Sequence, residues 1–483
     1  MENQITNVKR WLILFNVSLS IFMSTLDGSI VNIALPVISK QLSVSISSIQ
    51  WVVTSYLLTI SVLLLVWGRI SDLFGKKHIF ATGFMIFTIG SGLCAFSGSL
   101  AMLVLARILQ AIGASSMMAL SQGIVTSTFP AEERGRALGI TGTTVAIGSL
   151  VGPSLGGILT HLAGWQSIFL INVPIGIIGT ILTFSIIPEK LEKRDKKPFS
   201  GFDFNGSAMF AFAIILLFMG LLLLQEGVIP VAYAVPMVAV ALAVLFGFGR
   251  YEKKIVNPLI DFGLFKNKVF YFGIICAYLS FVGTFSINLF VPFFLQGVLN
   301  LNTLSAGLLI SFYPVTTAIV APISGWLSDK ITYRYLTVAG LIISAVTLIF
   351  VSRLNASSSF VEIAVLMSLQ GVGAAVFQSP NSSSVMGSVP RNRLGIAGGI
   401  NALFRNLGMV SGVAFSVIIF SFATKMNINN LSDATAFDPA VFLKGFRVVV
   451  YFAACAYFLA FLFSITRAIR SKGDAADADA TQT

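Results

Sequence analysis

The chain has 483 residues, of which 56% are hydrophobic and 10% are charged, and its formal net charge is +12. A soluble domain carries about 25% charged residues, so the composition excludes an ordinary soluble enzyme and indicates a polytopic membrane protein. The three cysteines lie in apolar stretches without a CxxC pair, which predicts neither a disulfide framework nor a metal site.

Long apolar stretches recur along the whole chain. A window of about 20 apolar residues for each membrane span predicts fourteen transmembrane helices. They are 11–36, 49–67, 78–97, 101–127, 136–160, 166–187, 206–225, 229–249, 269–293, 304–326, 335–353, 361–386, 394–422 and 446–468. The even number places both termini on the same side of the membrane.

The basic residues indicate which side that is. If both termini are inside, 24 of the 31 Lys and Arg residues lie in the inside segments or at the inner ends of spans, five lie in the outside segments or at the outer ends of spans, and two, Arg107 and Arg405, lie deep within spans. Lys and Arg accumulate in cytoplasmic loops, so we expect both termini in the cytoplasm. The positive charge then follows from membrane topology and does not indicate nucleic-acid binding.

The second half of the chain repeats the first at an offset of 256 to 260 residues. The matched positions are Asn32 and Asn288, Asp72 and Asp329, Gln110 and Gln370, Pro130 and Pro390, and Gly148 and Gly408. Such repeats build transporters that rock around a central site. We predict an all-α fold of two six-helix bundles with two extra central helices. The expected domains are 1–188, a linker region with the extra helices over 189–268, 269–470, and a disordered tail over 471–483.

Two charged residues within spans of the first half are candidates for coupling chemistry. A carboxylate at membrane depth is expensive unless it faces protein or water, which makes Asp27 a functional candidate. At 1.5 Å per residue, Asp27 lies about 13 Å and Arg107 about 10 Å from the outer ends of their spans, so the two could pair. Gln110, one turn on, could bond to either. The alternatives are a purely structural ion pair and an Arg107 that reaches the outer interface.

The segment 68–77, GRISDLFGKK, connects the second and third spans. Gly68 and Gly75 permit tight turns, and Asp72 can accept bonds from the amino end of a neighbouring helix. Lys76 and Lys77 can pair with acids. We interpret the segment as a conformational latch; the alternative is plain topological charge.

The fifth predicted span carries a stripe of glycines. Gly148, Gly152 and Gly156 are four residues apart and share one helix face, which lets another helix backbone approach closely. Gly157 adjoins the stripe, and Pro153 bends the helix. We expect a hinge or gate here.

Three further polar residues are possible substrate or gating contacts, namely Asn32, Glu362 and Arg405. Arg405 could contact a carboxylate or phosphate on a substrate, or cap a neighbouring helix. The segment 152–156 matches the hydrolase pattern G-x-S-x-G, but that motif requires a strand, a helix and a histidine partner, so we expect no enzyme activity.

Four motifs together resemble the major facilitator superfamily, specifically its fourteen-span drug:proton antiporter branch. LDGSIVNIALP (26–36) looks like the first-span motif of that branch, and GRISDLFGKK (68–77) looks like the loop signature of the superfamily. RILQAIGAS (107–115) is similar to the fourth-span motif. GSLVGPSLGG (148–157) resembles the fifth-span motif that marks exporters.

The resemblance implies roles for individual residues. Asp27 would bind protons and cationic substrates, Arg107 would couple them, and Asp72 would belong to the latch. The sequence departs from the family pattern at Ser29, where threonine is usual, and at Ala111, where glycine is usual.

We therefore expect a monomeric, proton-coupled exporter of hydrophobic, cationic drugs or toxic compounds in a bacterial cytoplasmic membrane. Its partners would be those substrates, protons and membrane lipids, and no cofactor, metal or nucleic acid is expected. The alternatives are a dedicated exporter of a lipid, fatty acid or metabolite, a nutrient symporter, and a membrane receptor or scaffold.

Overall fold

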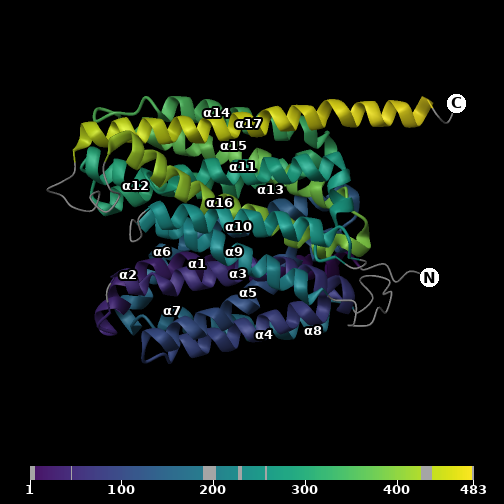
Figure 1. The fold of residues 1–483 in the computed structure, drawn as a ribbon, viewed down its shortest axis with the longest axis horizontal. Helices are drawn as coiled ribbons and strands as arrows, with labels where there is room; N and C mark the ends of the chain where they lie inside the picture. The colour runs from purple at the N-terminus through teal and green to yellow at the C-terminus, as the bar shows by residue number, and fades with distance from the viewer. Residues whose placement is uncertain are drawn as a thin grey trace. The chain divides into compact units, whose positions relative to one another are not determined.

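The computed structural model shows a helical protein (Figure 1). It describes residues 6–44, 46–188, 203–226, 231–255, 258–425 and 438–480. Within these ranges there is no β-strand, and fourteen helices are long and apolar enough to cross a membrane. The predicted number of spans is confirmed. Within the linker region predicted over 189–268, residues 189–202 lie outside the described residues.

The first compact unit, called unit 1, comprises Met1–Ala211, Arg250–Asp261 and Val389–Leu403. Its long helices are α1 (Asn7–Gln41), α3 (Trp51–Phe74), α4 (Lys76–Ala95), α5 (Leu100–Thr128), α6 (Arg134–Ala163) and α8 (Asn172–Ile186); the short helices α2 (Ile46–Ile49) and α7 (Ser167–Leu170) lie between them. Helix α5 packs against α1, α3 and α4, while α1 packs against α6. The apolar faces of these helices thus meet around α5.

The second compact unit, called unit 2, comprises Phe212–Gly249, Phe262–Ser388 and Phe404–Thr483. Its bundle helices are α11 (Lys268–Asn288), α13 (Thr303–Lys330), α14 (Tyr333–Val351), α15 (Phe360–Gly387), the second part of α16 (Leu394–Thr424), and α17 (Pro439–Ala480). The helix pairs of unit 1 recur here: α3–α5 corresponds to α13–α15, α4–α5 to α14–α15, and α4–α8 to α14–α17. The internal repeat in the sequence is therefore a repeat in packing.

The unit boundaries differ from the predicted domains, because residues 389–403 belong with unit 1 and 212–249 with unit 2. The first turns of α16 pack backbone to backbone on α3 and α5. A Cβ atom on Gly398 would lie 2.5 Å from the Ala119 carbonyl oxygen, and one on Gly399 would lie 2.6 Å from that of Leu64. Only glycine permits this approach, so the helix start packs with unit 1.

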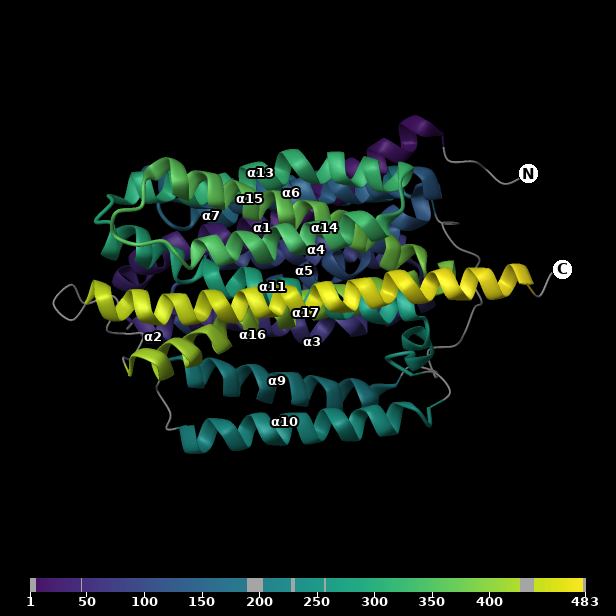
Figure 2. The same cartoon turned by 90° about the horizontal axis from the view of Figure 1, so that it is seen from above.

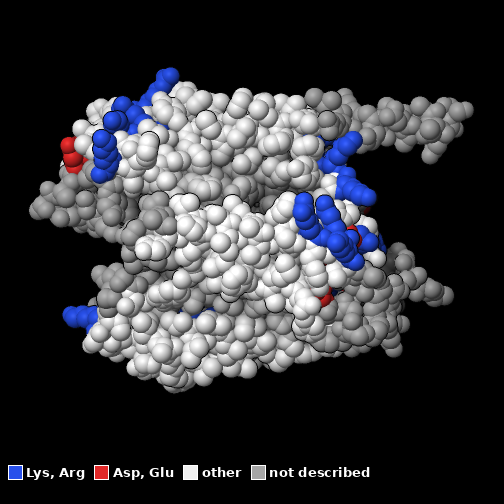
Figure 3. All heavy atoms as spheres, in the orientation of Figure 1, with Lys and Arg blue, Asp and Glu red and all other residues white. Residues whose placement is uncertain are grey.

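The two helices without a counterpart in the repeat are α9 (Phe204–Glu226) and α10 (Val231–Glu252). They run side by side (Figure 2), and Gly220 of α9 packs against Ala234 and Val238 of α10. On the face drawn in Figure 3, the charged side chains gather toward the helix ends, and the surface between them is nearly all uncharged. This distribution is the one that a bilayer requires.

The last helix is longer than predicted. Helix α17 continues to Ala480, so the tail expected to be disordered over 471–483 is helical through Ala480. The segment 471–480 reads SKGDAADADA, and alanine is the strongest helix former, which allows the helix to extend past its apolar part.

Candidate functional site

The two charged residues predicted to share a layer form a buried ion pair in unit 1. Asp27 of α1 accepts a hydrogen bond from Nη1 of Arg107 on α5, with 2.5 Å between Nη1 and Oδ2. Asp27 is 0% exposed and Arg107 is 1% exposed. Arg107 therefore does not reach for the outer interface, and each charge compensates the other at a depth where an isolated charge is unfavourable.

Amide side chains complete the network around the carboxylate. Gln110 donates from Nε2 to Asp27 Oδ1 and to Ser91 Oγ, each at 2.8 Å. Asn172 of α8 donates to the same Asp27 oxygen at 3.2 Å, and Gln110 Oε1 accepts from Arg107 at 2.6 Å. Residues of α5 and α8 thus donate to the carboxylate on α1, and Ser91 of α4 joins the network through Gln110; buried polar groups are tolerated when they are bonded in this way.

Aromatic rings enclose the guanidinium of Arg107. Its Cζ atom lies 4.0 Å from the centre of the Tyr56 ring and 5.7 Å from that of Phe169, while its Nε donates to the Val52 carbonyl oxygen at 3.1 Å. The site can therefore hold a charge, or a proton, away from water. A cationic substrate that approached Asp27 directly would have to displace Arg107.

Sequence reasoning predicted Asp27, Arg107 and Gln110 but missed Ser91, Asn172 and Tyr56. The signal available for Asn172 was a single amide within the apolar run FLINVPIG. Polar side chains inside spans are functional candidates by default, and that criterion applied to amides and phenols would have found Asn172 and Tyr56.

The glycine stripe of α6 packs against the helix that carries Asp27. A Cβ atom on Gly148 would lie 2.3 Å from Thr25 Oγ1, one on Gly152 would lie 1.8 Å from Ser29 Oγ, and one on Gly156 would lie 2.7 Å from Ile30 Cγ1.

Two other residues of the predicted motif, Gly157 and Pro153, do not belong to the stripe. No described atom lies within 4 Å of a Cβ on Gly157, so this residue is not part of the contact. Helix α6 continues through Pro153, whose missing N–H leaves one intrahelical bond unmade. Ser29 of α1 donates to the Gly148 carbonyl at 3.1 Å. Helices α1 and α6 therefore meet at van der Waals contact along the stripe.

The predicted latch residue Asp72 caps a helix. It accepts from the backbone N–H groups of Gly395 and Ile396, at the start of α16, each at 2.9 Å. The negative charge suits the positive end of the helix dipole. A Cβ on Gly68 would lie 2.7 Å from the Gly395 carbonyl oxygen, so glycine is required for α16 to reach Asp72.

The rest of the latch segment forms the turn between α3 and α4. Gly75 has φ of 91°, which L side chains rarely adopt. Lys76 is 3% exposed, whereas Lys77 is partly exposed. The segment is thus a packed turn, and its contact with α16 comes from Asp72 and Gly68.

Replacing Asp72 with alanine is expected to lower the free energy of unfolding by about 1.5–3 kcal/mol, because two N–H groups lose a charged acceptor. Asp72→Asn keeps one acceptor oxygen and should lie between alanine and wild type. Thermal unfolding of the purified protein in detergent measures this order. Equal melting temperatures for all three proteins would contradict the capping role.

Unit 2 replaces the ion pair with neutral groups. The counterpart of Asp27 is Gly283, and a Cβ there would lie 2.6 Å from the Tyr457 ring. The Tyr457 hydroxyl and Thr284 Oγ1 are hydrogen-bonded at 2.7 Å, and the counterpart of Arg107 is the buried Met367. The matched positions of unit 2 therefore carry no counterpart of the Asp27–Arg107 ion pair.

Two of the other predicted contacts, Asn32 and Glu362, have exposed side chains. Asn32 is exposed and donates to the Gly28 carbonyl of its own helix at 3.2 Å. Glu362 is exposed in the first turn of α15. Ser154 of the hydrolase-like pattern is exposed and donates to the Val151 carbonyl. Among the described residues, no group of three or more His, Cys, Asp or Glu side chains could hold a metal ion.

A second buried arginine was not singled out from the sequence. The predicted span 446–468 places Arg467 at its inner end, but the side chain is 2% exposed. Its Nη1 donates to Asn381 Oδ1 at 2.8 Å, and its Nη2 donates to Ser384. Asn381 in turn donates to the Gly273 carbonyl. These hydrogen bonds join α11, α15 and α17, so the packing of the three helices explains why Arg467 is buried.

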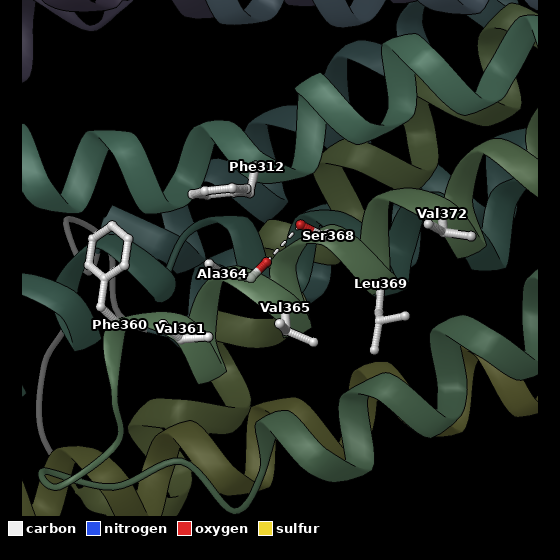
Figure 4. Close-up of a pocket in the computed structure, with 8 residues that line it drawn as sticks. All are labelled: Phe312, Phe360, Val361, Ala364, Val365, Ser368, Leu369 and Val372. Carbon is white, nitrogen blue, oxygen red and sulfur yellow. Dashed lines mark hydrogen bonds between the residues drawn. The ribbon is translucent and has the colours of Figure 1, made fainter.

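Unit 2 also has an apolar groove of about 350 Å³. Figure 4 shows its lining residues, which are Phe312 on α13 and Phe360, Val361, Ala364, Val365, Ser368, Leu369 and Val372 on α15. The one polar lining group, the Ser368 hydroxyl, is bonded to the Ala364 carbonyl at 2.8 Å. The groove can hold an apolar chain but offers no group that recognises a charge.

Comparison with known proteins places the chain among transporters. A family model described as Major Facilitator Superfamily matches residues 17–412 and 274–481. The chain is 36% identical to "Riboflavin transporter RibZ" of Clostridioides difficile, over 89% of this chain and 92% of that protein. It is 32% identical to "Multidrug resistance protein Stp" of Mycobacterium tuberculosis, over 84% of this chain and 75% of that protein.

A solved structure supports the fold. The human organic anion transporter MFSD10 (TETRAN) is similar with a TM-score of 0.66 and 14% identity, covering 94% of this chain and 99% of that one. At this identity the likeness concerns the fold alone.

Proposed function

Because the chain belongs to the Major Facilitator Superfamily, whose members transport solutes, we propose that it is a proton-coupled exporter of small hydrophobic compounds, cationic ones among them. The observation that carries this proposal is the carboxylate of Asp27, fully buried and shared by Arg107, Gln110 and Asn172. It lies on the helix that packs against the glycine stripe of α6.

The chemistry follows from charge. While Asp27 is ionised, it neutralises Arg107 and the network is closed. A proton on Asp27 removes the negative charge and leaves the buried guanidinium uncompensated, which is unfavourable in a medium of low dielectric. This unfavourable energy is relieved when the helices rearrange. We place the movement at the α1–α6 contact, where the glycines of α6 carry no side chains. Protonation from outside releases the substrate, and loss of the proton inside resets the site.

The distribution of basic residues supports both termini on the cytoplasmic side, and the bacterial relatives support a bacterial cytoplasmic membrane. No cofactor is needed, because the proton gradient supplies the energy, and one chain carries both bundles, so a monomer is sufficient. A second candidate function is dedicated export of one metabolite. It is favoured by the 36% identity to a relative named as a riboflavin transporter.

The test is transport by the purified protein in liposomes with an imposed pH gradient. The panel contains ethidium as a cationic dye, a neutral dye, and riboflavin. Gradient-driven movement of several unrelated dyes supports the export of hydrophobic compounds. Movement of riboflavin alone supports the dedicated transporter, and movement of none of them contradicts both.

A further inference from the structure

Arg405 of α16 differs from Arg107 and Arg467 because it has no described ion-pair or hydrogen-bond partner. No described side chain forms an ion pair or hydrogen bond with it, and its Nε atom is buried without a partner. By contrast, Arg107 is paired with Asp27, and Arg467 donates to Asn381 and Ser384.

Arg405 lies deep in its helix. It follows the first residue of α16 by eleven positions, which is about 16 Å along the axis at 1.5 Å per residue. An arginine within the hydrocarbon region is unfavourable unless it pairs or faces water. The described protein supplies no anion to Arg405, and the residue is partly exposed, so its guanidinium is open to water or to an anion from outside the chain.

The surroundings of Arg405 are aromatic. Its Cζ atom lies 4.8 Å from the centre of the Phe281 ring on α11. Phe281 stacks with Phe285, with 6.2 Å between ring centres, and Tyr278 meets Phe404 edge to face at 6.4 Å. Tyr278, Phe281 and Phe285 follow helical spacing and share one face.

Most of these groups are accessible, whereas Phe281 is only 6% exposed. Arg405, Tyr278 and Phe285 are all partly exposed, unlike the closed Asp27 pair. The aromatic face can stack against a planar ring, while the guanidinium can bind a carboxylate or sulfonate with two parallel hydrogen bonds.

We propose that Arg405 and the aromatic face of α11 form a subsite for the acidic group of planar aromatic substrates. This proposal rests on the proposed function in one respect, namely that unit 2 binds the transported substrate. It extends the substrate range from cations to acidic aromatic compounds, because Asp27 neutralises Arg107 whereas no described side chain pairs with Arg405.

The test is equilibrium binding to the purified protein in detergent, without a pH gradient. Two probes share one ring: pyrenesulfonate, a permanent anion, and a pyrene carrying a trimethylammonium group, a permanent cation. Arg405→Gln is expected to weaken pyrenesulfonate binding at least tenfold, equivalent to about 1.4 kcal/mol, and to leave the cation unchanged or bound more tightly. Arg405→Lys retains the charge but not the planar fork and should lie between.

The matched control is Arg353→Gln. Arg353 is exposed and also lies over a phenylalanine, 5.7 Å from the Phe350 ring centre, so its loss should change neither probe. Equal weakening of both probes by Arg405→Gln, or of neither, would overturn the subsite. So would loss of the Arg405 effect when phosphatidylglycerol is added, because the partner would then be a lipid headgroup.

This experiment is separable from that of the proposed function. Selective loss of the anion by Arg405→Gln supports the subsite even if no proton gradient drives transport. Gradient-driven transport with an unchanged pyrenesulfonate affinity in Arg405→Gln refutes the subsite and leaves the exporter standing.

Discussion

Asp27→Asn is expected to reduce pH-gradient-driven substrate accumulation in proteoliposomes to the level of protein-free vesicles. Asparagine keeps the shape of the side chain and one acceptor oxygen, but it can neither lose nor gain the proton. The variant therefore always has the charge of the protonated site, and nothing neutralises the positive charge of Arg107. Any downhill transport that the variant retains should be independent of pH between about 6 and 8, because no group at this position titrates.

The control is Asp438→Asn, which makes the same chemical change at an exposed residue that caps the start of α17. Asparagine caps helices as well as aspartate, so transport should be unchanged. Removing one partner of a buried pair can cost about 3–5 kcal/mol, so folding of Asp27→Asn must be checked by thermal unfolding. Gradient-driven accumulation at the wild-type rate in Asp27→Asn would eliminate this residue as the proton carrier.

Gly152→Val is expected to lower the initial rate of transport at least about tenfold, which corresponds to about 1.4 kcal/mol. A Cβ atom at this position would lie 1.8 Å from Ser29 Oγ and 3.2 Å from the Ile30 backbone nitrogen, so α1 and α6 must separate. Overpacking of this kind costs about 1–3 kcal/mol. Gly152→Ala adds one carbon and should have a smaller effect on the rate.

Gly157→Val is the matched control, since it lies on the same helix with no described atom within 4 Å of its Cβ position. Transport by this variant should remain near the wild-type rate. If Gly152→Val and Gly157→Val reduced the rate equally, the cause would be the effect of valine on the helix itself and not the α1–α6 contact.

Much of the fold could be predicted because a membrane imposes strong patterns on a sequence. Span length follows from bilayer thickness, and the repeat at a constant offset predicts two bundles with the same helix pairing. The Asp27–Arg107 pair could be predicted from depth alone, because two opposite charges in one apolar layer have few other partners. The glycines of α6 could be predicted because their spacing places them on one face.

Contacts between distant parts of the chain could not be predicted. The sequence indicates that Asp72 can cap a helix, but not that the helix is α16, some 323 residues later. For the same reason the unit boundary within α16 was missed. Asn172 and Tyr56 were overlooked because a single neutral polar residue in an apolar span carries a weak signal. Arg467 was assigned to the helix end because sequence position does not reveal burial.

The central claim is that proton movement and substrate movement oppose each other through Asp27. The direct measurement is the pH inside proteoliposomes, followed with an entrapped pH-sensitive dye, when a substrate gradient is imposed and the membrane potential is clamped. The account predicts that substrate flowing in one direction drives protons in the other, in wild type but not in Asp27→Asn. Substrate flow through wild type without any change in internal pH would contradict it.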